Sequence, residues 1–597
     1  MKRSSAIIIL ALLGSLVLPA AAAAGPTTHP VRVPLSFDFY YTYDMVVEAL
    51  QALHKAYPKL TRLDLVGKSE EGRPVYCLTV NNPASGAELS KPAIYVDGNI
   101  HGNEIQAGEV ALYLIDFLLG SYGSNEEITR LVDTRCFYVI PVVNADGRYH
   151  FFADAGTPSE NRSLRIPRDD DRDGLVDEDF PDDLDHDGNI CQMRKRDPYG
   201  EYKTDPDDPR LMVRVKPGEK GEWTILGDEG LDNDGDGLIN EDPEGYLDGN
   251  RNWGYNWMPE YVQGGAGEYP FSGAITRAIA DFVEKRPNIC VGWTFHNNGG
   301  MYLRGPSTKA QGEYPRQDIA VYDYLGQQAE RITPGYRYMI SWKDLYPTNG
   351  DSMEWLTMQH GVYGLCGELF QMESERFVTL KEGAGEKKEK PAEEEDEGGF
   401  DFREDPSLEK ERLKFSDNLA QGELYKPWRE FDHPTFGKIE IGGWVKMSSR
   451  LPAPFMLKDL VHRNAAAVIF SAKNTPEISL EIIETKPMGN GLTRVRTRLS
   501  NARAIPSMSF QAQKNKIYPK DTLTVSGAGL KVVAGGEIQD IYLHQVAFKE
   551  FRPELQFLAV PGFGKVEHEF LVSGAGTLTI AYQSRHAGKA SKVITLE

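Results

Sequence analysis

The sequence predicts an α/β domain that is interrupted by an acidic insertion and followed by an all-β, sandwich-like domain. Three observations carry this prediction. Helical and strand-like segments alternate over residues 37–143 and again over 274–369, which is typical of a sheet with helices on both faces. Between residues 168 and 247 this regularity gives way to Asp, Gly and Pro. Over residues 470–597, short alternating segments are separated by Gly, Asn and Pro, as in β-sandwiches.

Individual elements of the α/β domain follow from the spacing of apolar residues. The run Pro92–Val96 predicts a buried strand, and the stretch Ala107–Leu119 has the spacing of a packed helix. Other helices are expected at Tyr43–Tyr57, Ala274–Glu284 and Asp318–Arg331, and other strands at Thr61–Val66, Val75–Val80, Phe137–Val143, Ile289–Phe295 and Gly364–Leu369. We place the whole α/β domain, with its insertion, at residues 35–440.

The second half of the chain adds two further kinds of segment. Residues 381–403 are a low-complexity run of Glu, Lys, Gly and Ala that cannot bury enough apolar surface to fold alone, so we expect an exposed insertion. The charged stretch 404–423 is compatible with a helix. Strands of the β domain are expected at Thr493–Leu499, Leu523–Val525, Glu569–Val572 and Thr577–Tyr582.

The N-terminus has the three parts of a secretory signal peptide. Lys2 and Arg3 precede an apolar stretch that ends near Leu18, and an alanine run follows up to Ala24. A membrane anchor is the alternative, but the apolar core is shorter than the roughly 20 residues of a spanning helix, and Pro19 interrupts it. We therefore expect residues 1–24 to be removed, and the mature protein to be secreted or periplasmic without a stable membrane span.

Length, charge and cysteine usage limit the class of protein. A chain of 597 residues is too long for one core and suggests two to three domains. Its formal charge of −22 argues against nucleic acid or an anionic membrane surface as a partner, because both need a basic face. The five cysteines are scattered and odd in number, which excludes a disulfide framework.

A possible metal site begins where the predicted Pro92–Val96 strand gives way to a helix. His101 lies at that transition and Glu104 follows three residues later, which is a spacing of zinc ligands. His296 closes another apolar strand and can supply a third ligand. Two His and one carboxylate leave the fourth position of zinc open for water, as catalysis requires. Taken singly, each of these residues also fits a solvated loop or a histidine in a core.

Two other segments carry polar groups that fit the same chemistry. Arg251 offers a planar fork that binds a carboxylate, and the amide of Asn250 can hold the same group; a surface turn is the alternative. Glu368 stands alone in an apolar strand, where an unpaired carboxylate is expensive. It therefore needs a function or a salt-bridge partner.

Together these segments resemble the zinc carboxypeptidases of the carboxypeptidase A/B family, over most of the first 370 residues. The resemblance begins at Tyr41-Thr-Tyr-Asp44, Tyr57-Pro58 and the run from Gly67 to Pro74. The turn Asn144-Ala-Asp-Gly147 is similar to the family's Asn-Pro-Asp-Gly turn, with Ala in place of Pro. The resemblance implies a mixed β-sheet flanked by helices.

The resemblance also implies a role for each candidate residue. Zinc held by His101, Glu104 and His296 would polarise a water and the scissile carbonyl. Glu368 occupies the place of the general base, which takes the water's proton and delivers it to the leaving amine. Further residues are implied to fix the substrate's free carboxylate, namely Asn250, Arg251 and Tyr346.

Two residues are assigned by their position within the family's motifs. Met353 falls at the base of the side-chain pocket and predicts an apolar or aromatic terminal residue, although the nearby Asp351 leaves a basic residue open. The family's oxyanion-stabilising arginine sits in an Arg-Lys pair, and Arg194-Lys195 is the nearest match. The segment containing Arg162 and Arg165 is a rival, because it also resembles the sequence around that arginine.

The resemblance therefore implies a secreted zinc metallocarboxypeptidase that hydrolyses the C-terminal bond of peptides or proteins with a free C-terminus. One alternative is a murein-peptide hydrolase or amidase of the same fold, acting on cell-wall peptides. Another is a calcium-dependent binding protein with an inactive peptidase core, although such a protein needs none of the catalytic residues. Because no long pro-domain precedes Phe37, we expect activity without proteolytic release.

The chain departs from the family in its acidic insertion, residues 168–247. Two of its segments share the frame Asp-x-Asp-x-Asp-Gly-Leu with Glu-Asp behind it, beginning at Asp169 and at Asp232. Alternate carboxylates followed by Gly suit calcium. The segments are not EF-hands, because the twelfth residue of each frame is not the Glu that an EF-hand loop has there. A solvated acidic loop is the alternative. The candidate calcium ligands are Asp169, Asp171, Asp173, Asp185, Asp187, Asp232, Asp234 and Asp236. A second departure, Asn297-Asn298 after the third zinc ligand, suggests different substrate subsites.

Overall fold

A computed structural model describes residues 32–169, 174–242, 244–370 and 406–597 of the chain. The expected signal peptide, the low-complexity segment 381–403, and Asp171 and Asp173 of the first Asp-rich repeat lie outside these residues. In the described part of the chain, no helix is long and apolar enough to cross a membrane. All five cysteines are described, buried and free.

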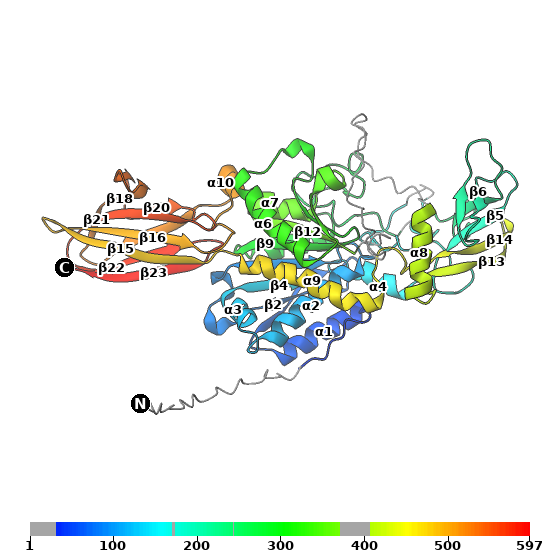
Figure 1. Ribbon diagram of the computed structural model, residues 1–597, viewed down its shortest axis with the longest axis horizontal. Coiled ribbons are helices and arrows are strands. Elements are labelled where there is room, and N and C mark those ends of the chain that lie inside the picture. Colours follow the sequence, from blue (N-terminus) through cyan, green and yellow to red (C-terminus); the bar gives the residue numbers. More distant parts are fainter. Residues whose placement is uncertain (1–31, 170–173, 243, 371–405) are drawn as a thin grey trace, which may run out of the picture.

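An eight-stranded mixed sheet forms the centre of the α/β domain (Figure 1). In spatial order its strands are β1 (Thr61–Lys68), β2 (Pro74–Val80), β4 (Cys136–Ile140), β3 (Ala93–Gly98), β9 (Ile289–Asn297), β12 (Tyr363–Leu369), β10 (Met301–Arg304) and β11 (Arg337–Ile340). Strands β4, β3, β9 and β12 run parallel, whereas β1, β2 and β10 pair antiparallel with a neighbour. The expected mixed sheet is confirmed.

Helices cover both faces of this sheet. They are α1 (Tyr43–Ala56), α2 (Ile105–Ser121), α3 (Glu126–Thr134), α4 (Ala145–Ala153), α5 (Ala274–Glu284), α6 (Arg316–Ile332), α7 (Ser352–His360) and α9 (Pro454–Lys473). Successive residues of β9 point to opposite faces: Trp293 bonds Ser471 of α9, and Gly292 lies against Leu356 of α7. Strands β3 and β9 are buried along their whole length, which explains their unbroken apolar sequences.

The register of the central strands brings three separate parts of the chain to one edge. Gly98 at the end of β3 pairs with Phe295 of β9, and His296 pairs with Glu368 of β12. The carboxyl ends of adjacent parallel strands form the usual ligand-binding edge of an open α/β sheet. Hence the segment after β3, the end of β9 and the end of β12 share this edge.

The acidic insertion contains more regular structure than its composition predicts. Its strands β5 (Gln192–Arg196), β6 (Tyr202–Thr204), β7 (Met212–Arg214) and β8 (Trp223–Asp228) join β13 (Tyr425–His433) and β14 (Gly437–Trp444) in an antiparallel sheet. The charged stretch 404–423 forms α8 (Pro406–Leu419), as expected. The expected end of the α/β domain at residue 440 is wrong, because α9 packs on α2 and α6 and extends the domain to Lys473.

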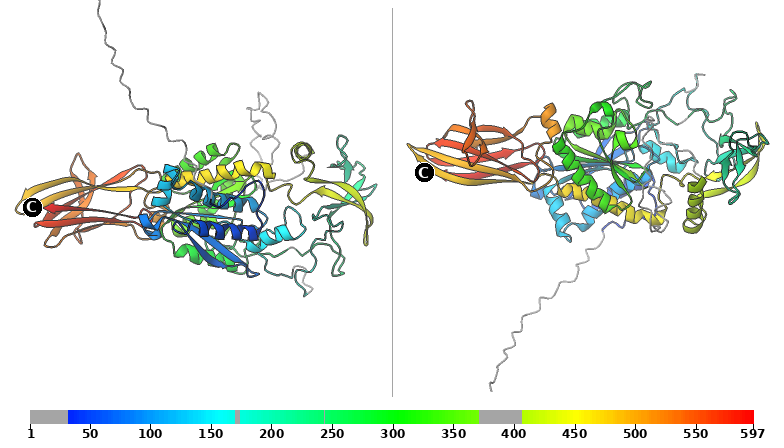
Figure 2. Two further views of the ribbon diagram at one scale, coloured as in Figure 1. Left: turned by 90° about the horizontal axis from the view of Figure 1, so that it is seen from below. Right: turned by 45° about the horizontal axis from the view of Figure 1, so that its top comes forward.

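Two further antiparallel sheets form the expected C-terminal sandwich. One contains β15 (Ile478–Gly489), β16 (Leu492–Asn501), β21 (Lys565–Ser573), β18 (Lys531–Asp540) and β19 (Gln545–Phe548), and the other β20 (Leu555–Leu558), β17 (Asp521–Ser526), β22 (Gly576–Gln583) and β23 (Lys589–Leu596). Their facing side chains, such as Val495, Leu523, Phe570 and Ile580, form a separate core. The sandwich and the insertion sheet lie at opposite ends of the α/β domain (Figure 2).

The sandwich contacts the α/β domain through the segment that contains α10 (Phe510–Asn515). The carboxylate of Asp318 on α6 accepts from the backbone N–H groups of Phe510 and Gln511, and Ser509 donates to the carbonyl of Gly361. His586 and His360 are buried in the same region. Burial, followed by the charge of Arg585, lowers the pKa of His586 to about 3 and that of His360 to about 4.

These two histidines predict an acid-sensitive contact. A folded-state pKa below the ordinary value of about 6.5 means that their stabilising effect is present above that pH and is lost as the pH falls below it. Each contributes a loss of about 1.4 kcal/mol per pH unit in that range. We expect the melting temperature to fall less steeply between pH 7 and pH 5 in His586→Gln than in the wild type or in His544→Gln, which alters an exposed turn. Equal slopes in all three proteins would contradict this account.

Candidate metal centre and active site

Three side chains converge at the edge formed by β3, β9 and β12. His101 follows β3, Glu104 is the residue immediately before α2, and His296 lies near the end of β9. All three are at most 3% exposed. The Nδ1 atoms of the two histidines lie 3.2 Å apart, and each faces Glu104, at 2.8 Å from Oε1 for His101 and 3.0 Å from Oε2 for His296.

This arrangement fits a zinc ion. Two imidazole nitrogens and one carboxylate are a donor set of catalytic zinc. Tetrahedral coordination with Zn–N distances of about 2.0–2.1 Å separates two nitrogen ligands by about 3.3 Å, close to the spacing of the Nδ1 atoms. Burial alone would raise the pKa of Glu104, but the charges and hydrogen bonds of His101 and His296 hold it well below its usual range. The site therefore presents an ionised carboxylate and two nitrogens to one point.

Each histidine is held by a second partner on its Nε2 atom. That of His101 lies 2.9 Å from Oδ1 of Asp248. That of His296 lies 3.1 Å from Thr294 Oγ1 and 3.3 Å from the side-chain amide of Asn250. Partners of this kind fix the ring orientation of metal-binding histidines. Asp248 was not singled out from the sequence, although it lies only two residues before Asn250.

Asp248 gives a prediction for metal affinity. Its carboxylate is placed to accept the Nε2–H of His101 and so to leave Nδ1 free for a metal. We expect Asp248→Asn to weaken zinc binding by about 10–100-fold, the usual cost of losing such a partner. Competition against a fluorescent zinc chelator would measure this, and Asp351→Asn, which changes a carboxylate that caps α7, is the control. Unchanged zinc affinity in Asp248→Asn would contradict the assignment.

Glu368, near the end of β12, faces the same centre. It is half-buried and pairs in register with His296. Loss of solvation raises the pKa of Glu368 to about 7; the charge of Glu104 adds to this, whereas His296 and Arg162 oppose it. A cation held by the three ligands would lower that pKa, because an opposite charge favours the ionised form. A carboxylate in this position can accept a proton at neutral pH.

A pocket opens beside this centre. It is lined by His101, Asn250, Arg251, Thr294, Leu303, Ser341, Leu345, Tyr346, Thr348, Asp351, Met353, Cys366 and Glu368. The predicted carboxylate-binding residues Asn250, Arg251 and Tyr346 therefore share one pocket with Glu368. The buried side chain of Met353 packs with Leu303 and Cys366 into an apolar cluster. Asn250 is fixed by the N–H of Ser352, which donates to its side-chain oxygen at 2.9 Å.

The structure does not place Arg194 at this centre, so its assignment as the oxyanion arginine is wrong. Arg194 lies in β5, where its guanidinium pairs with Glu440 at 2.6 Å and stacks between Trp223 and Trp428. Those contacts belong to the insertion sheet and hold the side chain there. The comparison with the family motif selected Arg194 wrongly, because an Arg-Lys pair is a short motif that also occurs by chance.

The rival arginine, Arg162, lies at the centre instead. It donates to Glu104 Oε1 at 3.0 Å and to Asp248 Oδ2 at 3.2 Å, and its charge acts on Tyr346 and Glu368. Arg165 points away and pairs with Glu71 at 3.0 Å. A second cation, Arg450, also acts on Glu368; it belongs to the segment before α9, and no motif in the sequence indicated it.

The candidate calcium ligands are divided among several small groups. Asp232, Asp234 and Asp236 form one, and Asp185 joins Asp183 and Glu229 in another. Asp187 instead pairs with Lys426 at 2.9 Å, and Asp169 accepts from the N–H of Gly174 at 3.2 Å. A group that was not predicted joins Asp179, Asp234 and Glu241.

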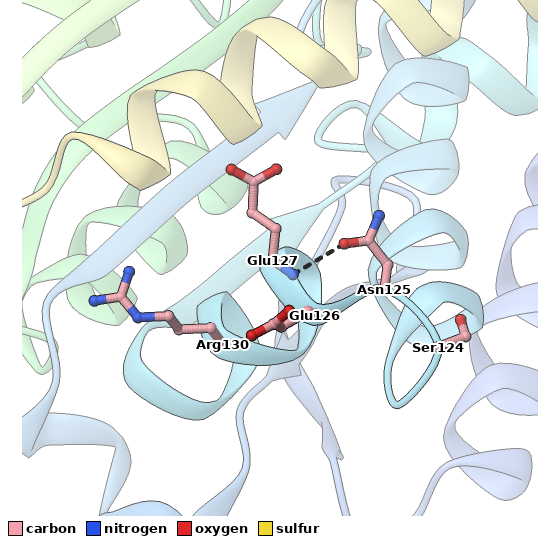
Figure 3. A pocket seen from close by; sticks show the side chains of 5 residues that line it. All are labelled: Ser124, Asn125, Glu126, Glu127 and Arg130. Atoms are coloured by element: carbon pink, nitrogen blue, oxygen red, sulfur yellow. Dashed lines mark hydrogen bonds between the residues drawn. The ribbon is translucent and has the colours of Figure 1, made fainter. Parts of the chain in front are cut away.

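Another hollow of the surface lies away from this chemistry, at the start of α3 (Figure 3). It is lined by Ser124, Asn125, Glu126, Glu127 and Arg130. The side-chain oxygen of Asn125 accepts from the N–H of Glu127 at 3.0 Å, as drawn, and from that of Ile128 at 3.2 Å. Asn125 thus caps α3, and we assign no function to the hollow.

Two family models match the chain. The model described as "Zinc carboxypeptidase" matches residues 46–205 and 234–391, which is more than half of the sequence. A second, "Domain of unknown function (DUF8731)", matches residues 477–595 and so coincides with the sandwich.

Several curated proteins are similar over a shorter stretch. Carboxypeptidase D of Mus musculus is 31% identical over 134 residues, which are 22% of this chain and 10% of that protein. Carboxypeptidase M of Mus musculus is 34% identical over 116 residues, 19% of this chain and 26% of that protein. The chain thus spans between a tenth and about a quarter of these relatives' length.

Solved structures are also similar. Carboxypeptidase A of Helicoverpa armigera is 19% identical with a TM-score of 0.41, over 76% of this chain and 79% of its own. A metallo-carboxypeptidase of Burkholderia cenocepacia is 14% identical with a TM-score of 0.31, over 55% of this chain and 60% of its own.

Proposed function

Because this chain belongs to the zinc carboxypeptidase family, we propose that it removes the C-terminal residue of peptides or proteins in a zinc-dependent hydrolysis. The observation that carries the proposal is one pocket in which a His–His–Glu donor set, a raised-pKa glutamate and a buried arginine lie together. The donor set and the glutamate supply metal-assisted hydrolysis, and the arginine supplies recognition of a free carboxylate.

His101, Glu104 and His296 would hold the metal through two Nδ1 atoms and a carboxylate. When bound, zinc supplies a Lewis acid and a water of lowered pKa. Glu368 accepts a proton at its carboxylate and returns it to the leaving amine. Arg162 lies against Glu104 and Asp248, where its guanidinium can donate to an oxygen that gains negative charge during the reaction.

Arg251 and Asn250 orient the end of the substrate. Arg251 is buried apart from its opening to the pocket, and within the described part of the chain its guanidinium donates only to the carbonyl of Asn250, at 2.8 Å. Its guanidinium therefore has free donors for a carboxylate. Tyr346, at the mouth of the pocket, is 37% exposed and can close over the same group.

The pocket favours an apolar or aromatic terminal residue. Leu303, Leu345, Met353 and Cys366 line it. Asp351 is the acidic group that could attract a basic side chain, but it already accepts from the N–H of Glu354 at 2.9 Å and from Thr348 Oγ1 at 3.2 Å. A partnered carboxylate attracts a cation less than a free one, which supports the apolar preference.

Two parts of the proposal rest on the sequence. The signal-peptide pattern of residues 1–24 supports a secreted or periplasmic enzyme. The repeated Asp-rich frame supports calcium on the insertion, because its carboxylates alternate as in calcium loops.

The proposal is tested with a blocked dipeptide that ends in free Phe and with its C-terminal amide. We expect the wild type to hydrolyse the acid and to leave the amide intact, and Arg251→Gln to lower kcat/KM for the acid by about 100-fold, mainly through KM. Lys309→Gln, which changes a cation outside the pocket, is the control. Equal hydrolysis of acid and amide would contradict a carboxypeptidase. No turnover by a zinc-loaded protein would favour cell-wall stem peptides as substrates.

A further inference from the structure

The two Asp-rich repeats of the insertion share two left-handed backbone positions and contact each other. Gly174 and Gly237, at matching positions, have φ values of 101° and 97°, and Asp177 and Asn240 have φ values of 52° and 59°. These are left-handed conformations, which Gly, Asn and Asp adopt most readily. The described residues of the first repeat thus match the second at these two positions.

Their last residues lie against one another. The N–H of Asp242 donates to the carbonyl of Asp179 at 3.3 Å, and the N–H of Glu178 donates to Asp242 Oδ2 at 3.1 Å. This contact brings three carboxylates together: oxygens of Asp179, Asp234 and Glu241 all lie within 4.8 Å of one another. One carboxylate comes from the first repeat and two from the other.

This group contains buried oxygens without a donor. Asp179 is fully buried; Asn233 donates to its Oδ1 at 3.1 Å, but its Oδ2 has no hydrogen-bond partner among the described residues. Oε2 of Glu241 is also buried without a partner within the described part of the chain. A buried carboxylate without a donor is costly, and a neighbouring negative charge adds to that cost. A cation at this point would remove both penalties.

The other two groups of three carboxylates among the described residues of the insertion lack this feature. Asp232, Asp234 and Asp236 accept from backbone N–H groups of their own loop at 2.6–3.0 Å. Glu229 accepts from the N–H groups of Cys191 and Leu184 with its two oxygens. The combination of converging carboxylates with unmatched buried oxygens therefore distinguishes the point where the repeats meet.

The repeats also stand at the two ends of the insertion, next to the proposed active site. The segment that enters the insertion and the segment that leaves it are joined by an isolated β-bridge, with the bond from Leu164 N to Leu247 O at 2.8 Å. Arg162 lies just before this bond, and Asp248 and Arg251 just after it. Arg162 and Asp248 then pair across the two segments at 3.2 Å. A contact that joins the two repeats therefore also ties together the two ends of the insertion, which carry Arg162, Asp248 and Arg251.

We infer that Asp179, Asp234 and Glu241 bind a divalent cation of the calcium type, and that this ion holds Arg162 and Arg251 in position for the reaction. An all-oxygen set of carboxylates suits calcium, whereas the His–His–Glu set suits zinc, so the two sites select different ions. Fixing the ends of the insertion also removes conformational freedom from its chain. The binding part of this inference stands on its own, and the positioning part rests on the proposed function.

The test uses the full mature chain, freed of metals on a chelating resin and given back one equivalent of zinc. Calcium binding is measured by calorimetry, together with the melting temperature. We expect saturable calcium binding and a rise in melting temperature of about 2–5 °C at saturating calcium. The variant Asp179→Asn/Glu241→Gln should lose one bound ion and that rise. Glu201→Gln, which removes a charge that is 65% exposed on the same insertion, should keep both.

Each outcome bears on one part of the inference. No calcium binding by the wild type at millimolar calcium, or unchanged stoichiometry and melting response in the double variant, would overturn the site. If calcium binds as expected but leaves KM for the free-acid dipeptide unchanged, the positioning role is overturned; a rise of several-fold in KM without calcium supports it. If calcium binds and stabilises the chain but no peptide is cleaved, the proposed function fails while the site stands.

Discussion

Replacing Glu368 by Gln is expected to lower kcat for the free-acid dipeptide by about 10³-fold or more, while zinc binding stays intact. Glu368 provides the carboxylate at the end of β12 that faces the metal centre, and an amide cannot accept the proton. General acid–base catalysis contributes about 10²–10⁴-fold, and Glu368 serves in both directions of proton transfer in the proposed reaction. The measurement is kcat in steady-state kinetics, with zinc content determined on the same samples.

The matched control for this variant is Glu354→Gln. Glu354 is a buried glutamate on α7 whose pKa is also raised, to about 8, by burial. It accepts from Tyr314 at 2.6 Å and from the N–H of Ser307 at 3.0 Å, and it does not line the pocket. Its substitution should leave kcat within about twofold of the wild-type value, because a change away from the reacting atoms removes no transition-state contact. Activity within tenfold of wild type in Glu368→Gln would mean that another group is the base.

The second large effect on kcat is expected when Arg162 is replaced, and Arg194 is the arginine with which it is compared. Arg162→Gln should lower kcat by about 10²–10³-fold, because it removes the charged donor that we propose for the developing oxyanion. Arg194→Gln should leave kcat unchanged, because that guanidinium lies between Trp223 and Trp428 in the insertion sheet. The pair is compared by single-turnover kinetics, which separate the chemical step from binding.

Arg162 also contacts Glu104 and Asp248, so its loss can disturb the metal. Zinc affinity is therefore measured for both variants, and Arg162→Lys is added to keep the charge without the planar fork. Partial recovery of kcat in the Lys variant at unchanged zinc affinity supports the oxyanion role. A kcat that falls in Arg194→Gln and not in Arg162→Gln would contradict the structural assignment.

The convergence of the three candidate metal ligands could be predicted from the sequence because their signals are local. His101 and Glu104 are three residues apart at a strand–helix junction, and His296 closes a strand whose residues are all buried. Strand ends of a parallel sheet meet at one edge, so the sequence implied that these residues come together. The same reasoning located Glu368 and the segment of Asn250 and Arg251.

The oxyanion arginine could not be predicted, because the choice depends on the path of the insertion. Arg162 and Arg194 lie on opposite sides of the first Asp-rich repeat, and both resemble the family motif. Arg194 is removed from the centre by pairing of β5 with β14, a strand more than 200 residues later, as its bond to Glu440 shows. Short strands with charged residues give no periodic signal of such a pairing.

The helix α9 was missed for a related reason. Its apolar face is continuous enough to be buried against α2 and α6, and its sequence lies beyond the expected end of the domain. The buried contacts Trp293–Ser471 and Tyr302–Asn464 join it to the sheet, and they connect residues that are 178 and 162 positions apart. Tertiary contacts of this range cannot be read from local patterns.

Reconstitution with zinc shows whether the His–His–Glu centre is a catalytic zinc site. The chain is freed of metal with 1,10-phenanthroline, dialysed, and titrated with zinc while hydrolysis of the blocked dipeptide ending in free Phe is followed. We expect no hydrolysis without metal and a linear recovery of activity that ends at one equivalent of zinc. In His296→Gln we expect neither tight zinc binding nor recovery of activity. Full activity in the metal-free protein, or recovery in His296→Gln equal to that of the wild type, would contradict it.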